Sequence, residues 1–224
     1  MSAGGVTATI ESYLEAVFEL QEIGERVTQA RLARWFKVSP PATAEVVKRM
    51  EKMDLIRFAD DRTIELSVEG NRRAAEEAIR HRTIERYLVD VLGVPWHLSD
   101  EEVRNMEPGV SDVVFERMRA ALGGVDRCPH GNPIPGTEAA RRPIDDLVPL
   151  DTCDVGARVR IDRILEDLEL DRSTLRFLED NRLLPAAELD VDARGEDGSV
   201  TVRCGAASVS VGAALASHVL CVPA

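Results

Sequence analysis

Residues 27–66 constrain the fold more than any other part of the chain, because the spacing of their apolar side chains changes from helical to extended. Thr28 and Ser39 can each cap a short helix, and prolines after Ser39 suit a first helical turn. Two strands are expected next, at 56–58 and 63–66, joined by a charged turn. This order predicts a winged helix-turn-helix, a module that places its second helix in the DNA major groove.

The charge of this region differs from that of the whole chain. Residues 26–62 contain nine Lys or Arg against five Asp or Glu, a net charge of +4, whereas the chain carries −12. A basic island in an acidic protein indicates local, oriented contact with phosphate. The overall negative charge argues against diffuse binding to nucleic acid or to membranes.

The second helix of the module is expected at about 41–53, with one apolar and one polar face. The apolar face contains Val46, Val47, Met50 and Met53. The outward face contains Thr43, Glu45, Lys48, Arg49 and Lys52.

Several side chains of this region have the chemistry of DNA contacts. Small apolar groups can touch thymine methyls, and a carboxylate can accept a hydrogen bond from cytosine N4. Basic groups can hold phosphates and so position the module. The residues expected to contact DNA are Thr9, Gln29, Ser39, Pro41, Ala42, Ala44, Glu45, Lys48, Arg49, Lys52 and Arg62.

The remaining chain divides into helical, proline-rich and strand-like parts. Two long apolar helices are expected at 69–92 and 100–122, the second broken near Pro108-Gly109, and they favour a dimer interface over a purely intramolecular core. Residues 127–149 contain five of the eleven prolines and are predicted to form a stiff linker. Short strands around a helix at 172–181 predict a small β-barrel beyond it.

Composition and missing motifs exclude several classes of protein. No apolar run approaches the roughly 18 residues of a membrane helix, and the N-terminus has no secretory pattern, so we expect a cytoplasmic protein without membrane contact. The four cysteines are far apart in sequence, which fits reduced thiols. No nucleophile–His–carboxylate pattern, phosphate-binding glycine loop or HExxH occurs, so we expect neither an enzyme nor a small-molecule substrate.

Five segments together carry a resemblance to a known family. They are IESYLEAVFEL, HRTIERYLVDVLG, EPGVSDVVFERM, CPHGNPIPG and RVRIDRILEDLELDRSTLRFLEDNRLLP. With the winged helix, their order resembles the DtxR/MntR family of iron- and manganese-dependent repressors over nearly the whole chain.

The resemblance implies an α+β fold with four parts. These are a winged helix-turn-helix at 1–68, a helical dimerisation and metal-binding domain at 69–126, a proline-rich linker at 127–149, and an SH3-like, FeoA-type β-barrel at 150–224. It implies a homodimer that binds a palindromic operator on double-stranded DNA and represses metal-homeostasis genes when Mn²⁺ or Fe²⁺ is bound. Glu45 stands where relatives often have Gln, so a different operator preference is expected.

The resemblance also implies an ancillary metal site. Its ligands fall on His81, Glu85, Asp100, Glu166 and Glu169, and the first two share one helical face as an i, i+4 pair. Four carboxylates and one imidazole form an oxygen-rich set that suits Mn²⁺ or Fe²⁺.

The family's primary site falls on Ser12, Arg104, Glu107 and Pro108, and only Glu107 is a competent ligand. Glu11 or Glu102 could substitute, and Arg104 could pair with Glu107 as a built-in cation. The primary site is therefore expected to be degenerate.

Two alternative functions share this sequence. One is a DNA-binding regulator that needs no metal because Arg104 replaces it. The other is a protein-interaction module with vestigial DNA binding, which the cations Lys48, Arg49 and Lys52 disfavour. The run Cys128-Pro129-His130 could suggest a haem ligand, but we interpret it as a structural part of the linker.

Overall fold

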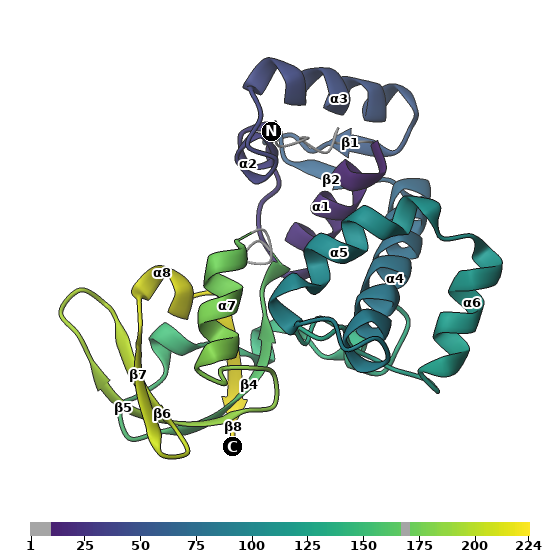
Figure 1. The fold of residues 1–224 in the computed structure, drawn as a ribbon. Coiled ribbons are helices and arrows are strands. Elements are labelled where there is room, and N and C mark those ends of the chain that lie inside the picture. The colour runs from purple at the N-terminus through teal and green to yellow at the C-terminus, as the bar shows by residue number, and fades with distance from the viewer. Residues whose placement is uncertain (1–9, 167–170) are drawn as a thin grey trace, which may run out of the picture. The chain divides into compact units, whose positions relative to one another are not determined.

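The computed structural model describes residues 10–166 and 171–224 (Figure 1). The chain forms two compact units, the first ending at Ile79 and the second beginning at Arg80. One helix, α4 (Val68–Asp90), begins in the first unit and ends in the second.

The first unit contains three short helices and a hairpin before α4. Their bounds are α1 (Ile10–Glu22), α2 (Gln29–Trp35), α3 (Pro40–Lys52), β1 (Ile56–Phe58) and β2 (Ile64–Leu66). Thr28 caps α2 by accepting from the backbone N–H of Arg31 at 3.1 Å, which satisfies a donor that has no helical partner. Lys37 turns the chain between α2 and α3 with a φ of 53°.

Apolar side chains of α1, α2, α3 and the hairpin are buried in the first unit, where these elements pack on one another. Fully buried residues include Leu14, Val17, Leu20, Val27, Leu32, Met50 and Ile64. The rings of Tyr13 and Phe36 stack with centroids 4.2 Å apart. Gly70 lets α4 pass close to the hairpin, because a Cβ at that position would lie 1.9 Å from the carbonyl oxygen of Leu55.

The second unit begins with helices that pack on the end of α4. They are η1 (Trp96–Leu98), α5 (Ser99–Met106), η2 (Glu107–Gly109) and α6 (Asp112–Ala121). The predicted break at Pro108-Gly109 is the short helix η2. Ile84, Leu88 and Val103 form the buried centre of this packing.

A six-stranded antiparallel sheet follows, in the order β3-β8-β4-β5-β6-β7. Its strands are β3 (Val148–Pro149), β4 (Arg158–Ile164), β5 (Glu188–Arg194), β6 (Val200–Cys204), β7 (Ala207–Val211) and β8 (Val219–Pro223). The accompanying helices are η3 (Ala139–Arg141), η4 (Ile144–Asp146), η5 (Leu150–Thr152), α7 (Arg172–Asp180) and α8 (Ala213–Ala216). The predicted α+β fold is confirmed.

Trp96 joins the helical part of the second unit to the sheet. It belongs to the same buried apolar cluster as the strand residues, and its backbone N–H donates to Oε1 of Glu179 on α7 at 3.0 Å. The side chains of His97 and Glu179 form an ion pair beside it. The sheet is therefore docked on the helices of its own unit.

The start of the proline-rich segment is packed into the protein. Cys128, His130 and Ile134 are buried. Gly131 has a φ of +90°, and a Cβ there would lie 2.3 Å from the carbonyl oxygen of Asp162 on β4. This close approach fixes Cys128 and His130 against the rest of the unit.

No helix within residues 10–166 and 171–224 is both long enough and apolar enough to cross a membrane.

Candidate nucleic-acid interface and metal centre

The outer face of α3 is exposed and rich in cations. Ser39 caps the helix by accepting from the backbone N–H of Ala42 at 3.4 Å, and prolines occupy its first two positions. Ala44 is half-buried. The exposed members of the predicted DNA-contact set on and before this helix are Ser39, Pro41, Ala42, Glu45, Lys48, Arg49 and Lys52.

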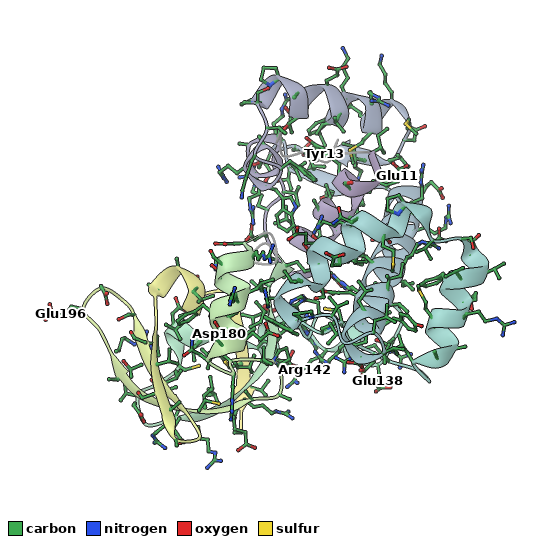
Figure 2. The ribbon with its side chains drawn as sticks, viewed as in Figure 1. Glu11, Tyr13, Glu138, Arg142, Asp180 and Glu196 are labelled. Carbon is green, nitrogen blue, oxygen red and sulfur yellow. The ribbon has the colours of Figure 1, made fainter. Side chains whose placement is uncertain are left out.

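The prediction of the helix faces was wrong at two positions. Thr43 is fully buried, and its hydroxyl lies 3.3 Å from that of Tyr13 on α1, which Figure 2 labels. A partner on α1 makes burial of this polar group possible. Met53 is 48% exposed because α3 ends at Lys52, so Met53 leaves the inward stripe of the helix.

The remaining predicted DNA contacts lie on α2 and the hairpin. Gln29 is half-buried at the first position of α2, and Arg62 is exposed at the hairpin tip. Arg57, on the same hairpin, forms an ion pair with Glu65 at 2.7 Å, which reduces the charge it offers to phosphate. Thr9 lies outside the described residues.

Three potential metal ligands meet in the second unit. Glu85 comes from α4, and Cys128 and His130 come from the start of the proline-rich segment. Their ligand atoms all lie within 4.8 Å of one another, and Oε1 of Glu85 is 2.7 Å from Nδ1 of His130. The three residues are at most 1% exposed.

The backbone around Cys128 and His130 is held by Trp96 and by a tight turn. The indole N–H of Trp96 donates to the carbonyl oxygen of Pro129 at 2.9 Å, and its ring centroid lies 4.3 Å from that of His130. The backbone N–H of Cys128 donates to the carbonyl of Asn132 at 2.9 Å. The imidazole and the thiol are therefore presented by a fixed backbone.

The carboxylate of Glu85 is charged and incompletely satisfied. Burial raises its pKa, but the charge and hydrogen bond of His130, together with the charge of His81, outweigh burial, so the pKa of Glu85 lies below its ordinary value. Ser99 donates to its Oε1 at 2.9 Å. Its Oε2 is buried and has no hydrogen-bond partner among the residues that the structure describes. A buried acceptor without a donor suits a cation.

A second cluster lies between α4, α5 and η2. Nε2 of His81 is 3.4 Å from Oδ1 of Asp100, and Nδ1 is 3.2 Å from Oε2 of Glu107. Arg104 binds Asp100, with Nε 2.9 and 3.0 Å from the two carboxylate oxygens. This contact of Arg104 is with Asp100, one turn earlier on α5.

The other predicted ligands have different surroundings. Nε of Arg82 lies 2.8 Å from Oε1 of Glu166, at the end of β4. Glu169 falls outside the described residues. Glu11, on α1 of the first unit (Figure 2), lies 3.0 Å from Arg73 in an ion pair.

The two clusters differ in their fit to a metal ion. A buried thiol, imidazole and carboxylate are the ligands that divalent transition metals use, and three of them leave coordination positions for water. In the His81 cluster, both ring nitrogens of His81 face carboxylates, and the guanidinium of Arg104 is bound to the carboxylate of Asp100. The Glu85–Cys128–His130 cluster therefore fits a metal ion, and the His81 cluster, in this arrangement, does not.

Sequence reasoning missed Cys128 and His130 as candidate ligands. It paired Glu85 with His81 because the two share a helical face, and it interpreted Cys128-Pro129-His130 as structural. Available signals were the two-residue spacing of a cysteine and a histidine, and the glycine that follows them. The missing information was that this segment packs beside Glu85 on α4.

Comparison with known proteins agrees with this architecture. Three family models match: the iron-dependent repressor N-terminal DNA-binding domain (residues 5–64), the iron-dependent repressor metal-binding and dimerisation domain (67–136), and the FeoA domain (148–223). The chain is 34% identical to the iron-dependent repressor IdeR of Mycobacterium tuberculosis over 87% of each protein. It is 32% identical to the diphtheria toxin repressor of Corynebacterium efficiens over 87% of this chain and 86% of that protein.

Solved structures show the same fold. A manganese-dependent transcriptional repressor in complex with manganese matches with a TM-score of 0.83 and 28% identity, covering 96% of this chain and all of that one. The IdeR of T. acidophilum matches with a TM-score of 0.78 and 26% identity, covering 98% and 100%. These relatives are repressors and not enzymes. The chain therefore belongs to the DtxR family of metal-dependent transcriptional repressors.

Proposed function

We propose that this protein represses transcription by binding a palindromic operator as a dimer, and that a divalent metal held by Glu85, Cys128 and His130 sets its DNA affinity. We infer that the genes under its control are those of metal-ion homeostasis, because a repressor whose DNA affinity depends on a metal ion reports the level of that ion. The observation that carries the proposal is the buried trio of ligands, because the ligand atoms of a thiol, an imidazole and a charged carboxylate lie there within 4.8 Å of one another.

The DNA-binding part of the proposal is supported by α3. Its exposed face carries Lys48, Arg49 and Lys52, which are placed to contact phosphates, and small residues at its N-terminus allow close approach to base edges. The exposed carboxylate of Glu45 is suited to accept from cytosine. The recognition function therefore resides in α3, with Arg62 of the hairpin as a flanking contact.

The continuous helix α4 supports a link between metal and DNA binding. It starts two residues after the end of the hairpin strand β2 and carries Glu85 near its other end. A change at Glu85 on metal binding thus acts on the same helix that follows the DNA-binding hairpin. This coupling is of the kind that changes affinity by about 5–150-fold.

The thiol of Cys128 bears on the identity of the metal. A sulfur ligand favours softer ions than an all-oxygen set does, and imidazole suits Fe²⁺ and Zn²⁺. The oxygen-rich ligand set inferred from the sequence suited Mn²⁺ and Fe²⁺ equally. With Cys128 and His130 as ligands, we infer that Fe²⁺ is the activating ion and that Mn²⁺ binds more weakly.

The dimer is supported by apolar groups on the surface of the second unit. Val113 and Val114, on α6, are 73% and 45% exposed, and Leu92, after α4, is 58% exposed. Large apolar groups that gather on helices outside a core are typical of protein interfaces. Two-fold symmetry would pair two copies of α3 with two operator half-sites.

The proposal is tested by DNA binding under controlled metal. Fluorescence anisotropy would measure affinity for promoter fragments without air, with Fe²⁺, with Mn²⁺ and with a chelator. We expect a chelator to weaken wild-type binding about 5–150-fold, in the range of allosteric couplings. The variants Cys128→Ser and His130→Gln should bind with the weak affinity of the chelated protein whatever metal is added.

Cys204→Ser provides the matched control, because Cys204 is a free cysteine outside the ligand trio and should leave the response intact. Equal wild-type affinity with metal and with chelator would contradict metal control. The absence of any sequence-specific binding would contradict the repressor function itself.

A further inference from the structure

The cluster of His81, Asp100, Glu107 and Arg104 contains two carboxylates and a histidine, which elsewhere could bind a metal. We propose that Arg104 is a built-in cation that closes this cluster in place of a divalent ion, so that the protein has a single regulatory metal site. The inference deepens the proposed function, which locates that single site at Glu85, Cys128 and His130.

The first support is the hydrogen-bonded ion pair between Arg104 and Asp100. Nη2 of Arg104 is 2.8 Å from Oδ1, and Nε contacts both carboxylate oxygens at 2.9 and 3.0 Å. Asp100 is only 4% exposed, so little water competes for its charge. A guanidinium matches a carboxylate in shape and holds it strongly in this way.

The second support is the position of His81, which is 6% exposed. Its Nε2 faces Asp100 at 3.4 Å and its Nδ1 faces Glu107 at 3.2 Å. Both ring nitrogens of His81 are therefore already placed against carboxylate oxygens of the cluster.

The guanidinium of Arg104 supplies the cation of the cluster. The carboxylates of Asp100 and Glu107 both lie against His81, and Arg104 neutralises the buried carboxylate of Asp100. An incoming divalent ion would have to displace a guanidinium that a buried carboxylate already holds.

The cluster around Glu85 shows the contrast. Its carboxylate faces a histidine and a serine, with a thiol beside them. Each cluster has one buried carboxylate oxygen without a hydrogen-bond partner among the described residues, Oε2 of Glu85 and Oε1 of Glu107. The clusters differ because a guanidinium is bound to Asp100. The two clusters share helix α4, where Glu85 lies one turn after His81. Adjacent turns of one helix thus carry an ion-paired cluster and a cluster that suits a metal.

The test is metal stoichiometry, measured by equilibrium dialysis with Mn²⁺ or Zn²⁺ and elemental analysis of the folded protein. Wild type should bind one ion per chain. Arg104→Glu removes the cation and adds a carboxylate beside Asp100 and Glu107, so this variant should bind two. The control is Arg86→Glu, which breaks another i, i+4 ion pair, with Asp90 on the exposed side of α4, and should still bind one.

Variants separate this inference from the proposed function. Cys128→Ser should remove one ion from wild type and from Arg104→Glu alike. If wild type binds none and Arg104→Glu binds one, the Glu85 site is refuted but the built-in cation stands.

An unchanged stoichiometry in folded Arg104→Glu would overturn the inference. So would a second wild-type ion that Asp100→Asn removes. If Arg104→Glu does not fold, the metal stoichiometry of Arg104→Gln tests the inference instead. It removes the charge and keeps hydrogen bonding, and a second ion in that variant supports the inference, whereas a single ion overturns it.

Discussion

Single residues around Glu85 determine whether its carboxylate can act as a ligand. The hydroxyl of Ser99 donates to Oε1 of Glu85 and also approaches the carbonyl oxygen of Trp96. This leaves Oε2 as the oxygen that can face an ion. Groups that hydrogen-bond to metal ligands orient them and tune their affinity.

Ser99→Ala should therefore weaken metal binding without removing a ligand. We expect the affinity for Zn²⁺ or Co²⁺ to fall about 10–100-fold, as when other outer groups of metal sites are lost. Competition with a coloured chelator measures this fall. Ser208→Ala, an exposed serine on β7, is the control and should leave affinity unchanged. Unaltered affinity in Ser99→Ala would show that the hydroxyl does not orient Glu85.

At the scale of elements, different side chains of α3 are expected to position the helix on the DNA backbone and to read the base sequence. Arg49→Ala should reduce the slope of log affinity against log salt by about 0.9, since one phosphate contact is lost. Its base preference should not change.

Glu45→Gln should instead shift the preference from cytosine toward adenine at one operator position, a change in binding free energy of about 1–3 kcal/mol. Selection of operators from a random pool, repeated at several salt concentrations, distinguishes the two effects. A salt slope unchanged in Arg49→Ala would place Arg49 away from phosphate.

The N-terminus of α7 depends on an aspartate cap. Asp171 accepts from the backbone N–H groups of Ser173 and Thr174, and the hydrogen bond with the Ser173 side chain is the largest cause that lowers its pKa. A lowered pKa means that its stabilisation is complete above the unfolded value of 3.8 and is lost as pH falls through the folded pKa.

Asp171→Ala should thus cost about 1 kcal/mol of unfolding free energy at pH 7. The difference from wild type should shrink as pH falls below 3.8. Denaturant unfolding at several pH values gives both quantities. Asp171→Asn retains an acceptor and is the control, with a smaller loss at neutral pH. A loss that stays constant with pH would show that the charge plays no part.

Local signals in the sequence were sufficient for most elements and insufficient for most side-chain partners. Thr28, Ser39 and the prolines after it predicted helix starts because a cap acts within three residues. The outward placement of Thr43 failed because its partner, Tyr13, lies thirty positions away. The pairing of Glu85 with His130 was missed for the same reason. Helical periodicity shows which residues share a face but not which distant segment packs against that face.

At the scale of the whole molecule, the function requires two chains. Val113→Asp would bury a charge in the proposed interface on α6, where no partner compensates it. We expect sedimentation to show a shift toward monomer and operator affinity to fall with it. Val155→Asp is the control, because Val155 is also exposed, at 57%, but lies in the loop between η5 and β4. A Val113→Asp protein that remains dimeric would place the interface elsewhere.

A regulatory metal bound by Glu85, Cys128 and His130 has a sulfur ligand, and this sulfur gives the site a direct spectroscopic signature. Optical absorption of the Co²⁺-loaded protein should contain a thiolate-to-cobalt charge-transfer band, since Cys128 supplies a sulfur ligand. The band should disappear in Cys128→Ser and persist in Cys153→Ser, another buried free cysteine. A Co²⁺-loaded wild type without the band, or a band that survives in Cys128→Ser, would contradict the assignment.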